Sequence, residues 1–90
     1  MANGVAYITI QQFCAFHQCE TVIIEEFIDH GIIEAREHGG IWTIQEPDVL
    51  RVERALRLRE ELGVNAAGID IILTLLERLE GQRFGAVEDL

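Results

Sequence analysis

Cys14, His17 and Cys19 are the residues of this chain that come closest to forming a chemical site. Thiolate and imidazole groups bind zinc, and three of them this close together resemble part of a metal site. No fourth ligand has a suitable spacing, and the paired C-x-x-C clusters of zinc fingers are absent from the sequence. We therefore interpret both cysteines as small core residues, and the sequence predicts no metal and no cofactor.

The patterns that support catalysis are also missing. The chain has no serine and no lysine, which excludes nucleophiles built on either residue. Gly39 and Gly40 stand at the expected tip of a hairpin and do not form a phosphate-binding loop. Glu25 and Glu26 are adjacent carboxylates, but we expect them on an exposed helix surface with no pocket around them. The sequence therefore predicts a protein that is not an enzyme.

These carboxylates form a surface on the helix that we expect from Thr21 to His30, which Gly31 ends. At 3.6 residues per turn, one face of this helix is apolar and should pack on the core: Ile23, Ile24, Phe27 and Ile28. The opposite face carries Glu25, Glu26 and Asp29, without an arginine or lysine. A solvated face without function is the general alternative for such a run of charge. The position of the helix in the fold favours an interaction surface.

A second short helix should hold this surface in place. Thr9 is a suitable N-cap and Gln12 completes a capping box, while Ile8 and Phe13 match a hydrophobic staple. Residues 17–20 then turn the chain into the acidic helix. Two short helices joined so closely suit a helix-turn-helix, whose second helix reads bases in DNA-binding proteins. Three carboxylates there would repel phosphate.

A β-hairpin is expected next. Two β-branched runs, 32–35 and 41–44, flank the Gly39-Gly40 turn, and such a hairpin attached to a helix-turn-helix would be a wing. Trp42 and Ile44 alternate with Thr43, so we expect one face of the hairpin to cap the core.

Pro47 and Asp48 indicate the start of a third helix, which should end at Leu62 before Gly63. Its expected apolar face consists of Val49, Val52, Ala55, Leu56, Leu58 and Leu62. Arg51 and Arg59 fall within that face. We expect each to pair with a carboxylate or to extend its charged end to solvent.

Asn65 should cap the last helix, from about Ala66 to Glu80. Its apolar face is wider than that of an ordinary surface helix: Ile69, Ile71, Ile72, Leu73, Leu75, Leu76 and Leu79. One neighbouring element cannot cover so wide a face.

Ile71, Leu75 and Leu79 form a ridge at one edge of that face. In one interpretation residues 81–85 fold back and Phe84 covers the ridge. In the other, which we prefer, the ridge is the contact of a symmetric homodimer.

Composition limits the class of protein. Ninety residues form a single domain, 1–90, in which we expect residues 1–6 and 82–90 to be flexible tails. The net charge is -9 and all seven cations are arginine. This charge disfavours nucleic acid and anionic membranes and favours a basic protein partner. There is no basic, apolar leader and no apolar run of about 20 residues, so we expect a cytoplasmic protein with reduced thiols.

The order of these elements resembles the MerR-type winged-helix family. The closer resemblance, over residues 7–80, is to its chaperone-modulator branch of the CbpM type. It rests on these segments: Phe13-Cys14, Glu25-Glu26-Phe27-Ile28, Gly31-Ile32-Ile33-Glu34, Arg57-Leu58-Arg59-Glu60-Glu61-Leu62 and Gly68-Ile69-Asp70-Ile71-Ile72-Leu73. The resemblance implies a mainly α fold: a winged helix-turn-helix with a short hairpin wing and two further helices. Gly81 and Gly85 predict a shorter last helix than such proteins often have.

The resemblance also implies a function. Chaperone modulators of this type bind the J-domain of the DnaJ-like co-chaperone CbpA, and thereby restrain its work with Hsp70 and its DNA binding. Because J-domains present a basic helix to Hsp70, the expected contact is Glu25, Glu26 and Asp29, with Arg54 and Arg57 as further candidates. The alternative is a MerR-like transcription regulator that binds DNA through a set of cations: Arg36, Arg51, Arg54 and Arg57.

Overall fold

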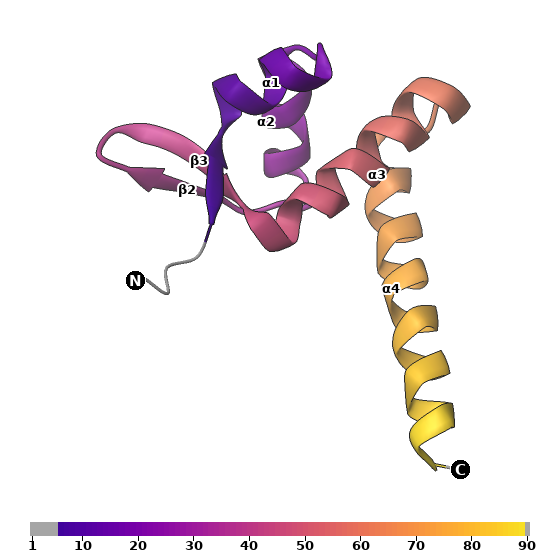
Figure 1. The fold of residues 1–90 in the computed structure, drawn as a ribbon. Helices are drawn as coiled ribbons and strands as arrows, with labels where there is room; N and C mark the ends of the chain where they lie inside the picture. Colours follow the sequence, from indigo (N-terminus) through magenta and orange to yellow (C-terminus); the bar gives the residue numbers. More distant parts are fainter. Residues whose placement is uncertain (1–5, 90) are drawn as a thin grey trace.

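The computed structural model describes residues 6–89 of the chain, with side chains for residues 6–81. Figure 1 shows the order of elements: β1 (Tyr7–Thr9), α1 (Ile10–His17), α2 (Thr21–Asp29), β2 (Ala35–His38), β3 (Ile41–Gln45), α3 (Glu46–Leu62) and α4 (Ala66–Asp89). The prediction of a mainly helical protein is confirmed, since the described residues form four helices and one small sheet.

The start of α1 follows directly from its sequence. The Gln12 backbone N–H donates to Thr9 Oγ1 at 3.0 Å, and the Thr9 N–H donates to Gln12 Oε1 at 3.1 Å. This reciprocal pair is the predicted capping box. Gln18 ends the helix in the left-handed region at φ 54°, and a short connection leads into α2. The closeness of α1 and α2 is therefore fixed by local interactions.

The segment after α2 differs from the prediction. Gly31 adopts φ 72°, and the Ile32 N–H donates to the Phe27 carbonyl at 2.9 Å, which closes the helix. Ile32 and Ile33 are both buried, with 1% and 4% of their surfaces exposed. Residues 32 and 33 form a bend and pair with no strand, and both side chains enter the core. The predicted strand over residues 32–35 is therefore wrong, and β2 begins at Ala35.

The sheet has three antiparallel strands in the order β1-β3-β2, so the extended run before α1 joins the hairpin. Ile44 lies at the centre, opposite Ile8 on one side and Ala35 on the other, and is fully buried. Thr43 is buried as well, and its hydroxyl donates to the Arg36 carbonyl at 2.9 Å.

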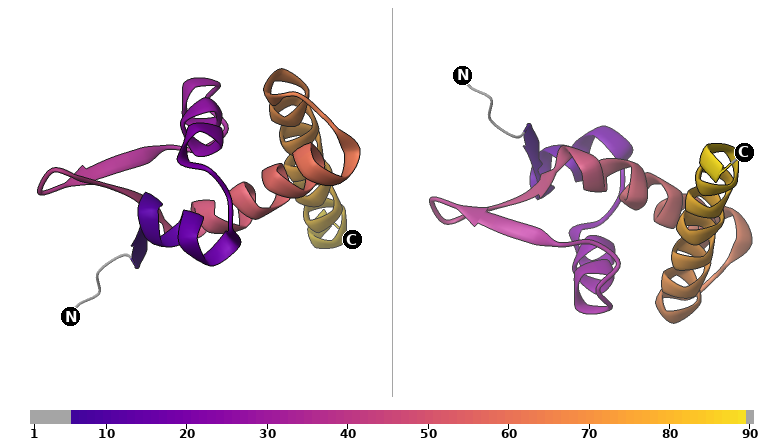
Figure 2. Two further views of the ribbon diagram at one scale, coloured as in Figure 1. Left: turned by 90° about the horizontal axis from the view of Figure 1, so that it is seen from above. Right: turned by 90° about the horizontal axis from the view of Figure 1, so that it is seen from below.

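The predicted core-facing side of the hairpin is confirmed at Ile44 and wrong at Trp42, which does not reach the core. Trp42 lies on β3, two residues nearer the hairpin tip than Ile44, and 54% of its surface is exposed. The hairpin extends beyond the helices, as Figures 1 and 2 show, so its outer half has no core to cover.

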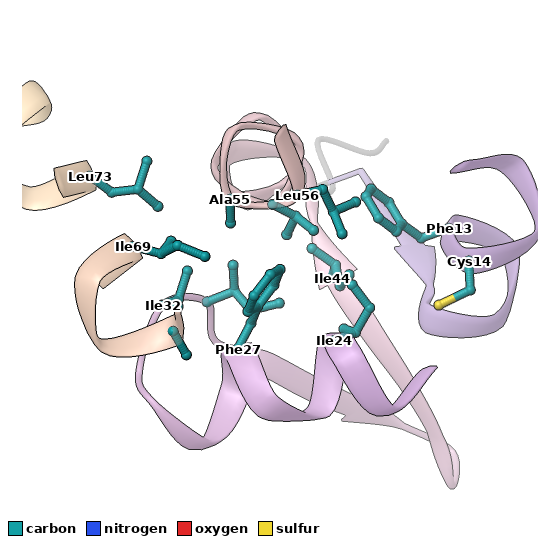
Figure 3. Packing of buried hydrophobic residues seen from close by; sticks show 13 residues of the cluster. Phe13, Cys14, Ile24, Phe27, Ile32, Ile44, Ala55, Leu56, Ile69 and Leu73 are labelled. Carbon is teal, nitrogen blue, oxygen red and sulfur yellow. The ribbon is translucent and has the colours of Figure 1, made fainter. Parts of the chain in front are cut away.

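The core lies where α1, α2, β3, α3 and the start of α4 meet (Figure 3). Its largest buried side chains come from all of these elements and from the bend after α2: Phe13, Ile24, Phe27, Ile32, Ile44, Val52, Ile69 and Leu73. Leu62 was predicted to join this core, but it is the last residue of α3 and is 70% exposed.

Helix α4 begins as predicted, because the Asn65 side-chain oxygen accepts a hydrogen bond from the Gly68 N–H at 2.8 Å. Ile69 and Leu73 anchor it in the core, Glu77 and Glu80 still contact α3, and the end of the helix projects away from the domain (Figure 1). The backbone stays helical to Asp89, so the predicted end near Glu80 is wrong. Within this described helix there is no turn at residues 81–85 where the chain could fold back. The expected N-terminal tail lies outside the described residues except for Ala6.

Candidate functional site

The outer face of α2 carries the three carboxylates that the sequence singled out. Glu25 and Asp29 are exposed and take part in no ion pair with the described residues. Glu26 is half-buried, and its Oε1 accepts a hydrogen bond from Arg59 Nη1 at 3.2 Å. A shallow hollow beside Val22 is lined by all three carboxylates and by Arg59. Glu25 and Asp29 are therefore available to a partner, while Glu26 also holds α2 against α3.

Arg51 and Arg59 each pair with a carboxylate, as predicted for arginines within an apolar helix face. Arg51 Nε lies 2.7 Å from Glu77 Oε2, and its guanidinium also donates to the Ile32 carbonyl. These contacts tie the bend after α2 to α3 and α4. Both arginines are thus structural, which removes Arg51 from the cations available to a partner.

Arg54 and Arg57 lie at a different place from the acidic face. They line a hollow of about 340 Å³ between α3 and α4, together with Leu62 and Leu76. Arg54 Nη2 is 3.1 Å from Glu80 Oε2, whereas Arg57 is exposed. Of this pair, Arg57 is the more available for intermolecular contact.

A groove between α2 and the β2–β3 hairpin was not predicted as part of the site. It consists of two hollows of about 170 Å³ and 600 Å³ that share Ile10, Glu25 and Trp42 in their linings. Trp42 is the residue that sequence reasoning missed, because its alternation with Thr43 indicated a core side chain. The sequence signal that could have marked it is its closeness to the Gly39-Gly40 tip, where a hairpin leaves the core.

The ridge on α4 is exposed along its whole length. Ile71, Leu75 and Leu79 have 60%, 55% and 58% of their surfaces accessible, and Leu76 beside them has 39%. No other part of the described domain therefore covers the apolar ridge that we predicted to be an interface.

Cys14 lies on α1 and Cys19 in the connection that follows it, and both are free thiols. Cys14 is buried and Cys19 is half-buried against the core. Burial, and then hydrogen bonding with Cys14, raises the pKa of the Cys19 thiol to about 12. Within residues 6–81, no three His, Cys, Asp or Glu side chains come together in a way that could hold a metal ion. No helix in the described part of the chain is long and apolar enough to cross a membrane.

Comparison with known proteins identifies the family. The MerR helix-turn-helix family of regulatory proteins matches residues 8–83, and this chain belongs to it.

Within that class, the relatives point to a particular branch. Proteins named chaperone modulatory protein CbpM, from Salmonella arizonae, Salmonella newport and Salmonella heidelberg, are each 38% identical to this chain. The similarity extends over 78 residues, which is 86% of this chain and 77% of each relative. The chain is therefore a member of the CbpM-type chaperone-modulator family.

Proposed function

We propose that this protein is a non-enzymatic chaperone modulator of the cytoplasm, which binds the J-domain of a DnaJ- or CbpA-type co-chaperone. Binding would inhibit the action of that co-chaperone on Hsp70 and its own DNA binding. The observation that carries the proposal is the acidic outer face of α2. The names of the relatives, which are chaperone modulatory proteins, support it.

The physical basis is charge complementarity. In this proposal α1 and α2 form a helix-turn-helix and the hairpin forms its wing, but the second helix presents Glu25, Glu26 and Asp29 where a DNA reader needs cations. The surface of a J-domain that engages Hsp70 is basic. Opposite charges speed encounter and select the partner more than they raise affinity. A rigid helix, anchored in the core by Ile24 and Phe27, keeps these carboxylates in a fixed arrangement.

The contact is proposed to centre on Glu25 and Asp29. Glu26 would add to the local charge while it stays paired with Arg59. Arg54 and Arg57 are the second proposed contact, with Arg57 at the accessible end of that pair. Both regions belong to helices that pack on the core, so neither requires a loop to become ordered.

A homodimer is the second part of the proposal. Ile71, Leu75 and Leu79 offer an exposed apolar ridge on a helix that projects from the domain, and a two-fold pairing of one ridge on itself closes the assembly. We propose that this ridge is the dimer contact.

A DNA-binding transcription regulator is the alternative, and the family as a whole favours it. Arg36 on β2 and Arg57 on α3 are its remaining exposed candidates, since Arg51 and Arg54 are engaged with Glu77 and Glu80. Arg36 itself lies 3.5 Å from Glu34. Two such cations on a chain of net charge -9 provide little phosphate neutralisation.

The test is a steady-state ATPase assay with a cognate Hsp70 and the isolated J-domain of its co-chaperone. Addition of this protein should abolish the stimulation by the J-domain and leave the basal ATPase rate of Hsp70 unchanged. Full stimulation in the presence of excess protein would contradict the proposal.

A further inference from the structure

Trp42 is a large side chain that the fold keeps at the surface. It lies on β3, the central strand of the sheet, where its backbone pairs with Glu37 of β2. Its indole is 54% exposed and lines both hollows of the groove between α2 and the hairpin. The strand thus holds the Trp42 ring beside the groove, at a position where the ring does not pack in the core.

The groove beside this ring is negatively charged. Glu25 lines both hollows, and Asp29, one helical turn further along α2, lines the smaller one. Among the described residues that line the two hollows there is no arginine, lysine or histidine. Apolar surface from Ile10 and Ile28 completes the smaller hollow. The site therefore combines an aromatic face, two carboxylates and an apolar wall.

We propose that this groove binds an arginine side chain of the protein partner. The methylene stem would lie against Ile10 and Ile28, and the guanidinium would stack on the Trp42 indole and hydrogen-bond with Glu25 and Asp29. The identity of the partner rests on the function proposed above, while the arginine site rests on the groove itself.

Arginine fits this combination better than other side chains. An aliphatic or aromatic side chain would bury two carboxylates without compensating charge. The ammonium of lysine is a compact and strongly hydrated charge, whereas the planar guanidinium stacks on aromatic rings and binds carboxylates with two parallel hydrogen bonds. Trp42 would then determine specificity for the partner, in addition to the charge that α2 supplies.

Trp42 is the only tryptophan in the chain, so its fluorescence reports on the groove directly. The first probe is an alanine-based helical peptide that carries arginines one turn apart, compared with the same peptide carrying lysine or glutamine. The second probe is the J-domain of a cognate co-chaperone, and the binding of both probes to every variant is measured by calorimetry. Each probe is tested with the native protein, Trp42→Ala and Trp42→Phe. The matched control is Leu50→Ala, since Leu50 on α3 is 55% exposed and lies outside the lining of the groove.

The arginine peptide should change the Trp42 emission saturably and bind more tightly than the lysine peptide, and the glutamine peptide should give no change. Trp42→Ala should weaken binding of both the arginine peptide and the J-domain by about fivefold or more, with partial recovery in Trp42→Phe and no effect of Leu50→Ala. Equal binding of the arginine and lysine peptides would overturn the inference. So would J-domain binding that Trp42→Ala leaves unchanged, although the proposed function would then stand. An arginine peptide that binds through Trp42 while no J-domain binds would support the groove and refute the proposed function.

Discussion

Arg51 is a cation whose role is internal to the fold. Its side chain is only 19% exposed, it pairs with Glu77, and it donates to the Ile32 carbonyl in the bend after α2. An arginine inside an apolar helix face is predictable from sequence, but its two acceptors, one of them 26 residues further along the chain, are not. Long-range partners depend on how the helices pack, which the helical periodicity of α3 alone does not specify.

Replacement of Arg51 should therefore reduce stability. Arg51→Ala leaves the Ile32 carbonyl and the Glu77 carboxylate without their donor, and we expect a loss of about 1–3 kcal/mol in the free energy of unfolding. The control is Arg57→Ala on the same helix, whose exposed side chain should change stability by less than about 0.5 kcal/mol. Urea unfolding followed by far-UV circular dichroism measures both. Equal losses in the two variants would contradict this role of Arg51.

Cys19 gives a prediction for alkaline pH. Its folded-state pKa of about 12 lies above the ordinary value of 9.0, so the folded protein keeps the thiol proton after the unfolded chain has lost it. The free energy of unfolding should fall as the pH rises from about 9 towards 12, and Cys19→Ala should make this fall smaller. Urea unfolding at a series of pH values tests the effect. A stability that rises over this range, or an identical fall in the variant, would be incompatible with the protected thiol.

At the scale of single elements, local rules predict most starts and ends of helices, although Gly81 does not end α4 as they indicated. The Thr9–Gln12 capping box, the turn at Gln18, the Asn65 cap and the end of α3 at Gly63 are all confirmed, because each depends on neighbours in sequence.

The elements that were predicted wrongly depend on tertiary context. Ile32 and Ile33 have strong β propensity, yet they form a bend in which both side chains are buried in the core. Trp42 has the alternation of a core side chain, yet it lies beyond the core. The sequence predicted one part of the candidate site, the acidic face of α2. It could not predict the Arg59–Glu26 pair or the groove beside Trp42. Both form only when α3 and the hairpin pack on α2.

Helix α4 gives the prediction about assembly. Leu75 lies at the middle of the exposed ridge, so Leu75→Glu should place a charge on each side of the proposed two-fold contact and convert a dimer into a folded monomer. Thr74→Glu is the control, because the neighbouring position is exposed but lies off the ridge. Sedimentation equilibrium at micromolar concentrations distinguishes the two states. A native protein that is already monomeric would refute the proposed contact.

At the scale of the whole molecule, net charge separates the two proposed functions. A chain at -9 whose second helix presents carboxylates should not bind duplex DNA specifically at physiological salt, since phosphate contacts need local cations. Fluorescence anisotropy with genomic fragments, including the promoter of its own gene, tests this expectation. Sub-micromolar, sequence-dependent binding would favour the transcription regulator over the chaperone modulator.

The negative charge of the chain, and of α2 in particular, should attract a basic protein partner. Each exposed ion pair contributes about 0.2–1 kcal/mol, so a single substitution on α2 should have a mild effect. The joint replacement Glu25→Gln, Glu26→Gln and Asp29→Asn should weaken binding of the J-domain by roughly 1–2 kcal/mol and reduce its dependence on salt. The matched control is Glu46→Gln, Glu60→Gln and Asp70→Asn, which changes the net charge equally but lies on α3 and α4.

The most direct measurement is isothermal titration calorimetry of the native protein, the α2 triple variant and the control triple variant with a cognate J-domain, at low and at raised ionic strength. We predict one-to-one binding that weakens with salt for the native protein and the control, and clearly weaker binding for the α2 variant. Tight binding that the α2 variant retains would place the contact elsewhere, and the absence of binding to any cognate J-domain would contradict the proposed function.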